Sequence, residues 1–136
     1  MDVRKGVLLV IKNKDNKYLL LQHTRDEKWG FVSGGIEPED TDNIAAAVRE
    51  SEEEVGFMPE RDKIHDLGIT MEFETPKYKG EYKWYEYSAD GDLDLRLQHP
   101  DEIKAVGWFS EGEVFEMIKD KPLLVETFKK YVTIES

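Results

Sequence analysis

Three glutamates, Glu50, Glu53 and Glu54, stand close together in an alanine-rich segment that has the composition of a helix. Residues on a helix advance by about 100° each, so these carboxylates would share an arc of about 100°. Crowded like charges repel and raise each other's pKa values, and a divalent cation removes both penalties. Oxygen ligands without cysteine or a convergent histidine favour Mg²⁺ or Mn²⁺ over zinc. The pattern indicates either such a metal site or an ordinary solvated acidic helix face.

The same helical arithmetic predicts how the helix packs. A stripe that spans roughly 60° should face the core, and it consists of Ile44, Val48, Ser51 and Val55. The three carboxylates would then be turned away from the core. Ala46 and Ala47 lie on the carboxylate side, where small residues would let the Gly34-Gly35 segment pack closely above the acids. A buried Ser51 hydroxyl needs a partner, for which we expect a carbonyl one turn back.

The elements that position this helix are predicted from apolar runs and turn signals. Strands are expected at Val7–Ile11, Tyr18–Leu21, Trp29–Val32, Ile64–Glu74, Glu81–Tyr87 and Ile103–Phe109, the first two as a hairpin. The acidic helix should begin after a Thr41 or Asp42 cap and stop at Gly56. Later helices are expected at Glu111–Ile118, capped by Ser110, and from Pro122 to Tyr131. This order predicts an α+β fold with a mixed sheet packed by helices.

Length and composition narrow the classes of protein. The 136 residues fit one domain, and the net charge of −11 argues against broad binding to nucleic acid. The absence of cysteine excludes disulfides, thiolate metal sites and a cysteine nucleophile. The N-terminus lacks an apolar signal core, and the longest apolar run, Val7–Ile11, is too short to span a membrane. We therefore expect a cytoplasmic protein.

Seven residues around the three glutamates resemble the Nudix box, G-x5-E-x7-R-E-U-x-E-E-x-G-U, in which U is a bulky aliphatic residue. The matching positions are Gly35, Arg49, Glu50, Glu53, Glu54, Gly56 and Phe57. The hairpin, the Trp29-Gly30-Phe31 entry and the late Gly107-Trp108-Phe109 strand are also similar to the family. The chain is thus identified as a MutT-like Nudix hydrolase over residues 1–136, and this resemblance implies an α/β/α sandwich with a mixed sheet between helices.

Two positions depart from the box. The loop glutamate, which in the family braces the loop against the helix, falls on Thr41. Asp40 would match it only if Gly34 is taken as the first glycine and one extra residue is allowed before Arg49. The aliphatic position after Arg-Glu is Ser51, which we expect to lower stability and leave the metal site intact.

The resemblance implies roles for individual residues. Glu53 and Glu54 would be metal ligands, and Glu50 would be either a ligand or the base that activates water. The carbonyl of Gly35 would complete the metal shell, and Arg49 could orient Glu53 at i,i+4 spacing. Many members take a further carboxylate from a loop before the late strand. Glu102 stands at that place, as a catalytic acid or as an exposed loop residue.

Substrate choice depends on residues outside the box. Parts of the chain resemble bacterial RNA pyrophosphohydrolases, and the related dinucleoside tetraphosphatases share the Trp-x-Phe entry and the acidic loop. On this basis Arg4 could touch phosphate, and Tyr82 or Trp84 could stack on a base, although Trp84 also has the pattern of a plain core residue. Three further residues near the site entrance could meet phosphate or simply be exposed, and they are His23, Arg25 and Lys28.

The leading hypothesis is Mg²⁺-dependent hydrolysis of a dinucleoside polyphosphate or of a triphosphorylated RNA 5′ end. Cleavage of (d)NTPs to monophosphate and pyrophosphate is the second, and a non-catalytic nucleotide sensor is a third. Retention of all three glutamates favours catalysis. Isoprenoid diphosphate isomerisation is set aside because the family's isomerases rely on a cysteine. The expected partners are a nucleoside polyphosphate and at most a second copy of the chain, with no membrane.

Overall fold

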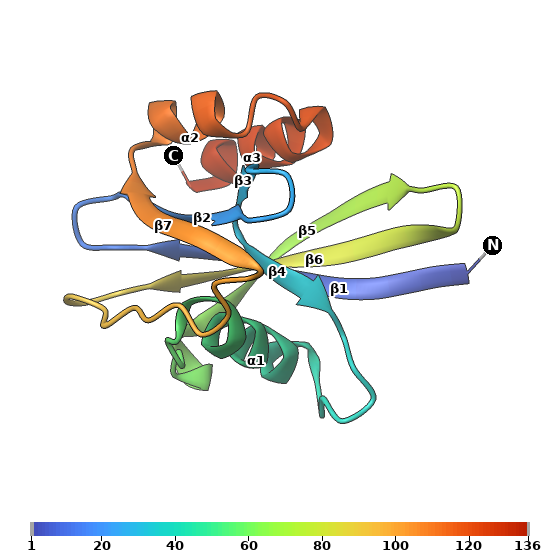
Figure 1. Cartoon of the computed structure of the whole chain (residues 1–136), viewed down its shortest axis with the longest axis horizontal. Coiled ribbons are helices and arrows are strands. Elements are labelled where there is room, and N and C mark those ends of the chain that lie inside the picture. The colour runs from blue at the N-terminus through green and yellow to red at the C-terminus, as the bar shows by residue number, and fades with distance from the viewer. Residues whose placement is uncertain (1, 136) are drawn as a thin grey trace.

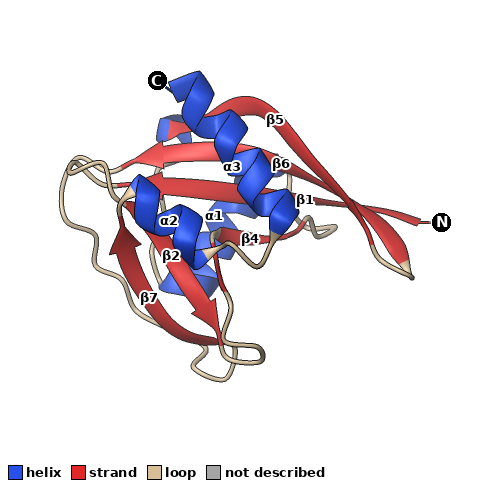
Figure 2. Ribbon diagram, turned by 90° about the horizontal axis from the view of Figure 1, so that it is seen from above, coloured by secondary structure: helices blue, strands red, loops and turns tan. Residues whose placement is uncertain are grey.

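The computed structural model describes residues 2–135 and shows a mixed sheet between two layers of helices (Figure 1). Its strands are β1 (Asp2–Lys12), β2 (Tyr18–His23), β3 (Trp29–Gly30), β4 (Val32–Gly35), β5 (Ile64–Glu74), β6 (Tyr78–Ser88) and β7 (Ile103–Phe109). Its helices are α1 (Asn43–Val55), α2 (Glu111–Met117) and α3 (Pro122–Glu135), with a 3₁₀ turn, η1, at Arg61–Lys63. Helix α1 covers one face and α2 with α3 the other, so the predicted α/β/α sandwich is confirmed (Figures 1 and 2).

Strand β1 lies at the centre of the sheet. It pairs in parallel with β6 along its whole length and antiparallel with β2 and β4. Strand β5 extends the sheet beyond β6, and β7 pairs with β2. The prediction of one strand over Trp29–Val32 is wrong, since this segment forms two short strands, β3 and β4. Gly30 pairs with Leu21 of β2, whereas Val32 pairs with Leu9 of β1, because the chain changes partner at Phe31.

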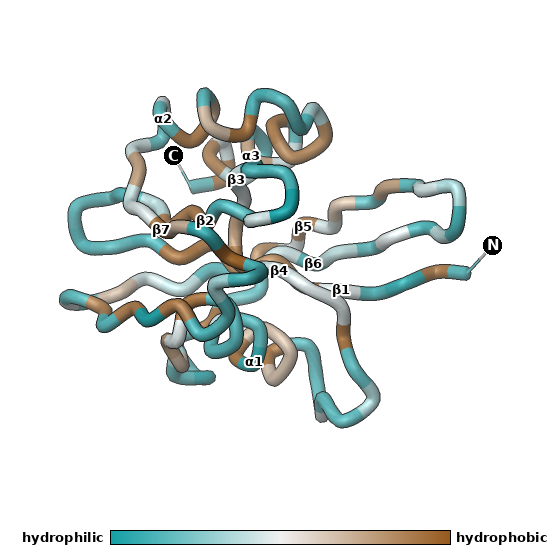
Figure 3. The backbone as a smooth tube through the Cα atoms, viewed as in Figure 1, coloured by the Kyte–Doolittle hydropathy of each residue, from teal (hydrophilic) through white to brown (hydrophobic). Residues whose placement is uncertain are grey.

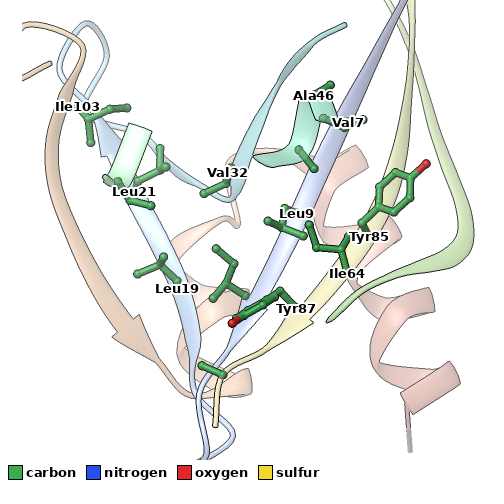
Figure 4. Close-up of a cluster of buried hydrophobic side chains, with 14 residues drawn as sticks. Val7, Leu9, Leu19, Leu21, Val32, Ala46, Ile64, Tyr85, Tyr87 and Ile103 are labelled. Carbon is green, nitrogen blue, oxygen red and sulfur yellow. The ribbon is translucent and has the colours of Figure 1, made fainter. Parts of the chain in front are cut away.

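The apolar runs of β1 and β2 are buried on both faces of the sheet, as expected for strands between two helical layers. Val7, Leu9 and Ile11 point to the α1 side, and Leu8 and Val10 point to the α2–α3 side. Figure 4 shows the first of these clusters, and Figure 3 shows the hydrophobic segments gathered at the middle of the molecule. In residues 2–135, none of the helices is long and apolar enough to cross a membrane.

The ends of α1 lie where the sequence predicts them. Asp42 is the N-cap, since its carboxylate accepts a hydrogen bond from the Ala45 N–H at 2.8 Å. Arg61 reaches back to the same carboxylate, with one contact at 2.6 Å. Gly56 ends the helix at φ 70°, in the left-handed region that favours glycine. These caps fix the position of the acidic helix along the sheet.

Ser51 is completely buried on the inner face of α1. Its hydrogen-bond partner differs from the predicted one. Its hydroxyl donates to the carbonyl oxygen of Phe57 at 2.7 Å, in the segment that follows the helix. The prediction that Ser51 bonds a carbonyl one turn back is therefore wrong. Because the chain reverses at Gly56, the Phe57 carbonyl is brought over the serine, and the polar residue ties the helix end to the next segment.

Replacing Ser51 with alanine should lower the free energy of unfolding by about 1–2 kcal/mol, since a buried hydrogen bond is lost. Turnover should stay close to that of the unchanged protein. Urea denaturation of the Ser51→Ala variant measures the first quantity, and Ser88→Ala, at an exposed serine, is the matched control. Equal stabilities for the two variants would contradict a structural role for the Ser51 hydroxyl.

Candidate active site on the acidic helix

Helix α1 presents a face to the sheet that differs from the predicted stripe. Glu50 is 9% exposed, while Ile44 and Val48 are only partly buried. Ala46 and Ala47 are fully buried and let the helix backbone approach the sheet. The helix is therefore rolled toward its acidic side, and the expectation that all three carboxylates turn away from the core is wrong. Only Glu53 is exposed in that way.

The glycine turn at the end of β4 packs directly on these carboxylates. Gly34 lies so close to the Glu50 carboxyl group that an added Cβ would collide with it. The backbone N–H of Ser33 donates to Glu54 at 3.1 Å. The predicted close packing of the Gly34-Gly35 segment is confirmed. A side chain at position 34 would displace the carboxyl group of Glu50, so glycine here lets that group lie against the turn.

Arg49 joins the acidic loop, the glycine turn and the helix. Its guanidinium donates to both oxygens of Asp40, at 3.0 and 2.9 Å, and to the carbonyl oxygen of Gly35 at 2.9 Å. It also donates to Glu50 at 2.8 Å, and more distantly to Glu53 at 3.5 Å. The predicted pairing of Arg49 with Glu53 is thus present, but the contact with Glu50 is closer.

Asp40 occupies the bracing position that the family gives to a glutamate. Thr41, which the simplest register places there, is exposed. Asp40 also accepts the Glu37 N–H at 2.8 Å, so the loop is closed on itself as well as on the helix. The Arg49 guanidinium holds the pKa of Asp40 below its usual range. Asp40, which has a shorter side chain than glutamate and one extra residue between it and Arg49, therefore braces the loop against the helix.

Burial makes the two inner carboxylates costly to ionise. Desolvation raises the pKa of Glu50, and the hydrogen bond from Arg49 offsets part of that rise. Burial also raises the pKa of Glu54 to about 9, with the neighbouring charge of Glu50 as the next cause. A carboxylate pair in this state gains from a nearby cation, because positive charge favours the ionised form of both groups.

The donor chemistry of the site fits a hard divalent cation. In the part of the chain that the structure describes, no three acidic or histidine side chains converge as a ready-made metal cage. The reason is visible at Arg49, which draws Glu50 and Glu53 toward its own guanidinium. Glu54 has no such contact, and Glu53 is about half exposed, so its carboxylate is free to turn toward Glu54. Oxygen ligands of this type suit Mg²⁺ or Mn²⁺.

Glu102 lies beside this cluster. Its backbone carbonyl accepts the Thr24 N–H at 2.9 Å, and Thr24 also bonds the carbonyl of Pro100 at 3.0 Å. These contacts hold the loop before β7 against the turn after β2. The charge of Glu102 is the last of the causes that raise the pKa of Glu54, after burial and the charges of Glu50 and Glu53. The side chain of Glu102 is exposed, in a loop that is held in place through its backbone.

A pocket of about 440 Å³ opens between the sheet and the start of α3, and Ser33 lines it next to Glu54. Tyr82 lies in its wall, with its ring edge-on to Phe73 at 5.3 Å. Trp84 is 0% exposed in the core beneath α3, so it has no ring face free for a base. The prediction that Trp84 stacks on substrate is therefore wrong, because the alternating strand turns this residue into the core.

The other predicted substrate residues are spread around the site. Arg4 lies on the exposed end of β1, 4.2 Å above the ring of Tyr78. His23 lines the pocket, and burial lowers the pKa of its imidazole. Arg25 and Lys28 are exposed and make ion pairs with Asp26 and Asp120. Sequence reasoning missed Lys121, which also lines the pocket, because a single lysine before a helix carries no motif.

The fold and the acidic cluster together define a small pyrophosphohydrolase domain, in which a glutamate-rich helix packs under a glycine turn. The NUDIX domain model matches residues 2–131, so the chain belongs to the Nudix family. It is a Nudix pyrophosphohydrolase, an enzyme that cuts pyrophosphate bonds of nucleotide substrates.

Individual relatives agree with this assignment. The RNA pyrophosphohydrolase of Pelagibacter ubique (strain HTCC1062) is 28% identical over 141 residues, which cover 92% of this chain and 87% of the relative. The MutT protein of Methanosarcina mazei Go1 superimposes with a TM-score of 0.84 at 18% identity, over 99% and 96% of the two chains. The Ap4A hydrolase of C. elegans gives a TM-score of 0.76 at 21% identity, over 98% and 99%. The two structures support the fold.

The brace predicts the effect of changing Asp40. An Asp40→Ala variant should lose about 10- to 100-fold in kcat/KM, because Arg49 and the Gly35 carbonyl would no longer be held in place. Thr41→Val, at the neighbouring exposed position, should have no effect. Steady-state kinetics on one cleaved nucleotide checks both. If Thr41→Val were as slow as Asp40→Ala, the brace would be assigned to the wrong residue.

Proposed function

We propose that this enzyme is Mg²⁺-dependent and cleaves a dinucleoside polyphosphate or a triphosphorylated RNA 5′ end. The observation that carries the proposal is the position of the pocket. It lies next to Ser33, whose backbone N–H is bonded to Glu54, so a nucleoside in the pocket would direct its phosphates at the acidic helix. Two relatives support this substrate class: one carries the name RNA pyrophosphohydrolase and the other the name Ap4A hydrolase.

The residues of the acidic helix have different roles in this proposal. Glu53 and Glu54 would hold the cation, together with the carbonyl of Gly35. The hydrogen bond from Arg49 uses one lone pair of that carbonyl oxygen and leaves the other for a metal. When bound, the divalent cation offsets the negative charge that builds on the phosphate oxygens. Glu50 is a further ligand or the group that takes the proton of the attacking water. Glu102, exposed in the loop before β7, is a second candidate for that proton.

Residues outside the helix hold the substrate. Tyr82 offers its ring to a base, since it lines the pocket beside Phe73. Arg4 contacts phosphate from the exposed end of β1. The closed pocket floor, formed by Leu8 and Phe31, keeps water away from one side of the nucleoside. An enzyme built in this way needs no broad basic surface.

The product pattern separates the proposal from its rival. A dinucleoside tetraphosphate should give NMP and NTP, and triphosphorylated RNA should give a monophosphorylated end. (d)NTPs should be cut more slowly, and chelator should abolish all turnover. A chromatographic screen with Mg²⁺ checks these outcomes. Preferred release of pyrophosphate from (d)NTPs would favour a MutT-like activity, and survival of every bound nucleotide would favour a sensor.

Glu53→Gln should lower kcat by orders of magnitude while the fold is kept, because the exposed carboxylate contributes charge to the cation and little packing. Glu52→Gln, the next residue along the helix and equally exposed, is the matched control and should be unchanged. Turnover and thermal unfolding are measured on both variants. A wild-type rate in Glu53→Gln would remove this residue from the site.

Glu102→Gln should also lower kcat, with little change in melting temperature, because its side chain makes no packing contact in the core. The exposed neighbour Asp101 provides the control, as Asp101→Asn. If the two variants turn over at the same rate, Glu102 is an ordinary loop acid.

A further inference from the structure

Lys121 places an ammonium group inside the nucleoside pocket. Its side chain is half-buried, and its Nζ donates to the carbonyl oxygen of Trp29 at 2.9 Å. Within residues 2–135, no carboxylate lies close enough to Nζ to form an ion pair. Gly30 leaves the room that the ammonium takes up, since a Cβ there would stand 3.2 Å from Nζ. An ammonium has three N–H donors, so at least one remains for a ligand.

The rest of the pocket has the shape and chemistry that a flat ring requires. Phe73 and Tyr82 stand on β5 and β6, and Leu123 at the start of α3 stands on the opposite side. These side chains are apolar over most of their surface, so a planar heterocycle gains from entering between them. The ammonium of Lys121 is therefore one of the few polar groups that a ring in this pocket would meet.

We propose that Lys121 reads the base and makes this enzyme prefer guanine over adenine nucleotides. The O6 and N7 atoms of guanine are both acceptors and match the free donors of an ammonium. Adenine presents N7 beside the N6 amino group, which is itself a donor and faces the ammonium unfavourably. This inference rests on the proposed function, because it places the nucleoside of the substrate in this pocket.

The surroundings of Lys121 argue against a phosphate at the same place. Burial lowers the pKa of Lys121, and the charged groups that act on it balance, with Asp26 and Asp120 against Lys28 and Arg25. These neighbours therefore add no net positive charge that would hold a polyphosphate at Lys121. The neighbouring His23 is held toward its neutral form by burial and offers little positive charge. The acidic cluster that would receive phosphate lies at the Ser33 end of the pocket. A neutral acceptor edge suits the Lys121 end better than an anion does.

The test compares paired substrates that differ only in the base, such as Gp4G with Ap4A. The unchanged enzyme should favour guanine by about tenfold or more in kcat/KM, within the range of a single well-placed base contact. Lys121→Met should lose this preference by slowing the guanine substrate alone. Lys121→Arg keeps the donors and should retain it. Lys119→Met, at an exposed lysine paired with Glu116, is the matched control.

Binding without turnover separates this inference from the proposed function. Calorimetric titration with GMP and AMP in chelator should show the same preference and its loss in Lys121→Met. Absence of cleavage with guanine-selective binding would overturn the hydrolysis proposal and leave the base assignment intact. Equal affinity for the two bases, or an equal loss for both in a folded Lys121→Met, would overturn the assignment. If Lys121→Met does not fold, the base preference of the unchanged enzyme and of Lys121→Arg decides the assignment.

Discussion

The guanidinium of Arg49 is the point at which the loop, the turn and the helix of this enzyme meet. It binds both oxygens of Asp40, the carbonyl of Gly35 and the carboxylate of Glu50. Bidentate pairs of this kind fix direction as well as distance. Without it, the loop over residues 37–42 would be held only by the Glu37–Asp40 contacts within it and by the bonds of Asp42 at its end. The geometry of the acidic cluster therefore depends on a positively charged residue, Arg49.

The roll of α1 toward the sheet buries two acids beside that guanidinium. Ala46 and Ala47 let the backbone approach, and Gly34 leaves space for the Glu50 carboxyl group. Two buried carboxylates would be costly in a site that served only the fold. Their cost is consistent with a site that gains its full stability when a cation and a polyphosphate are present. In the proposed function, the pocket beside Ser33 holds the nucleoside so that its phosphates reach this cluster.

Local signals in the sequence predicted α1, with its Asp42 cap and Gly56 stop, and the mixed sheet between helices. The α1 roll was missed because hydrophobic periodicity weighs Ile44 and Val48 above alanine, although small residues control close packing. The family resemblance suggested Trp84 as a stacking residue, whereas the alternation of its strand pointed to the core, and burial confirms the core position. The motif register offered Asp40 only as an alternative to Thr41, and the contact with Arg49 decides between them. Lys121 acts through a contact with Trp29, 92 residues away, which no single segment displays.

The central claim is that a divalent cation binds among Glu50, Glu53 and Glu54 and serves hydrolysis there. Anomalous diffraction from crystals soaked in Mn²⁺ with a non-hydrolysable nucleotide locates that cation directly. The account predicts a peak in contact with Glu53, Glu54 and the Gly35 carbonyl, with the nucleoside in the pocket lined by Tyr82. A cation held elsewhere, or a nucleotide bound with no cation at α1, would contradict it.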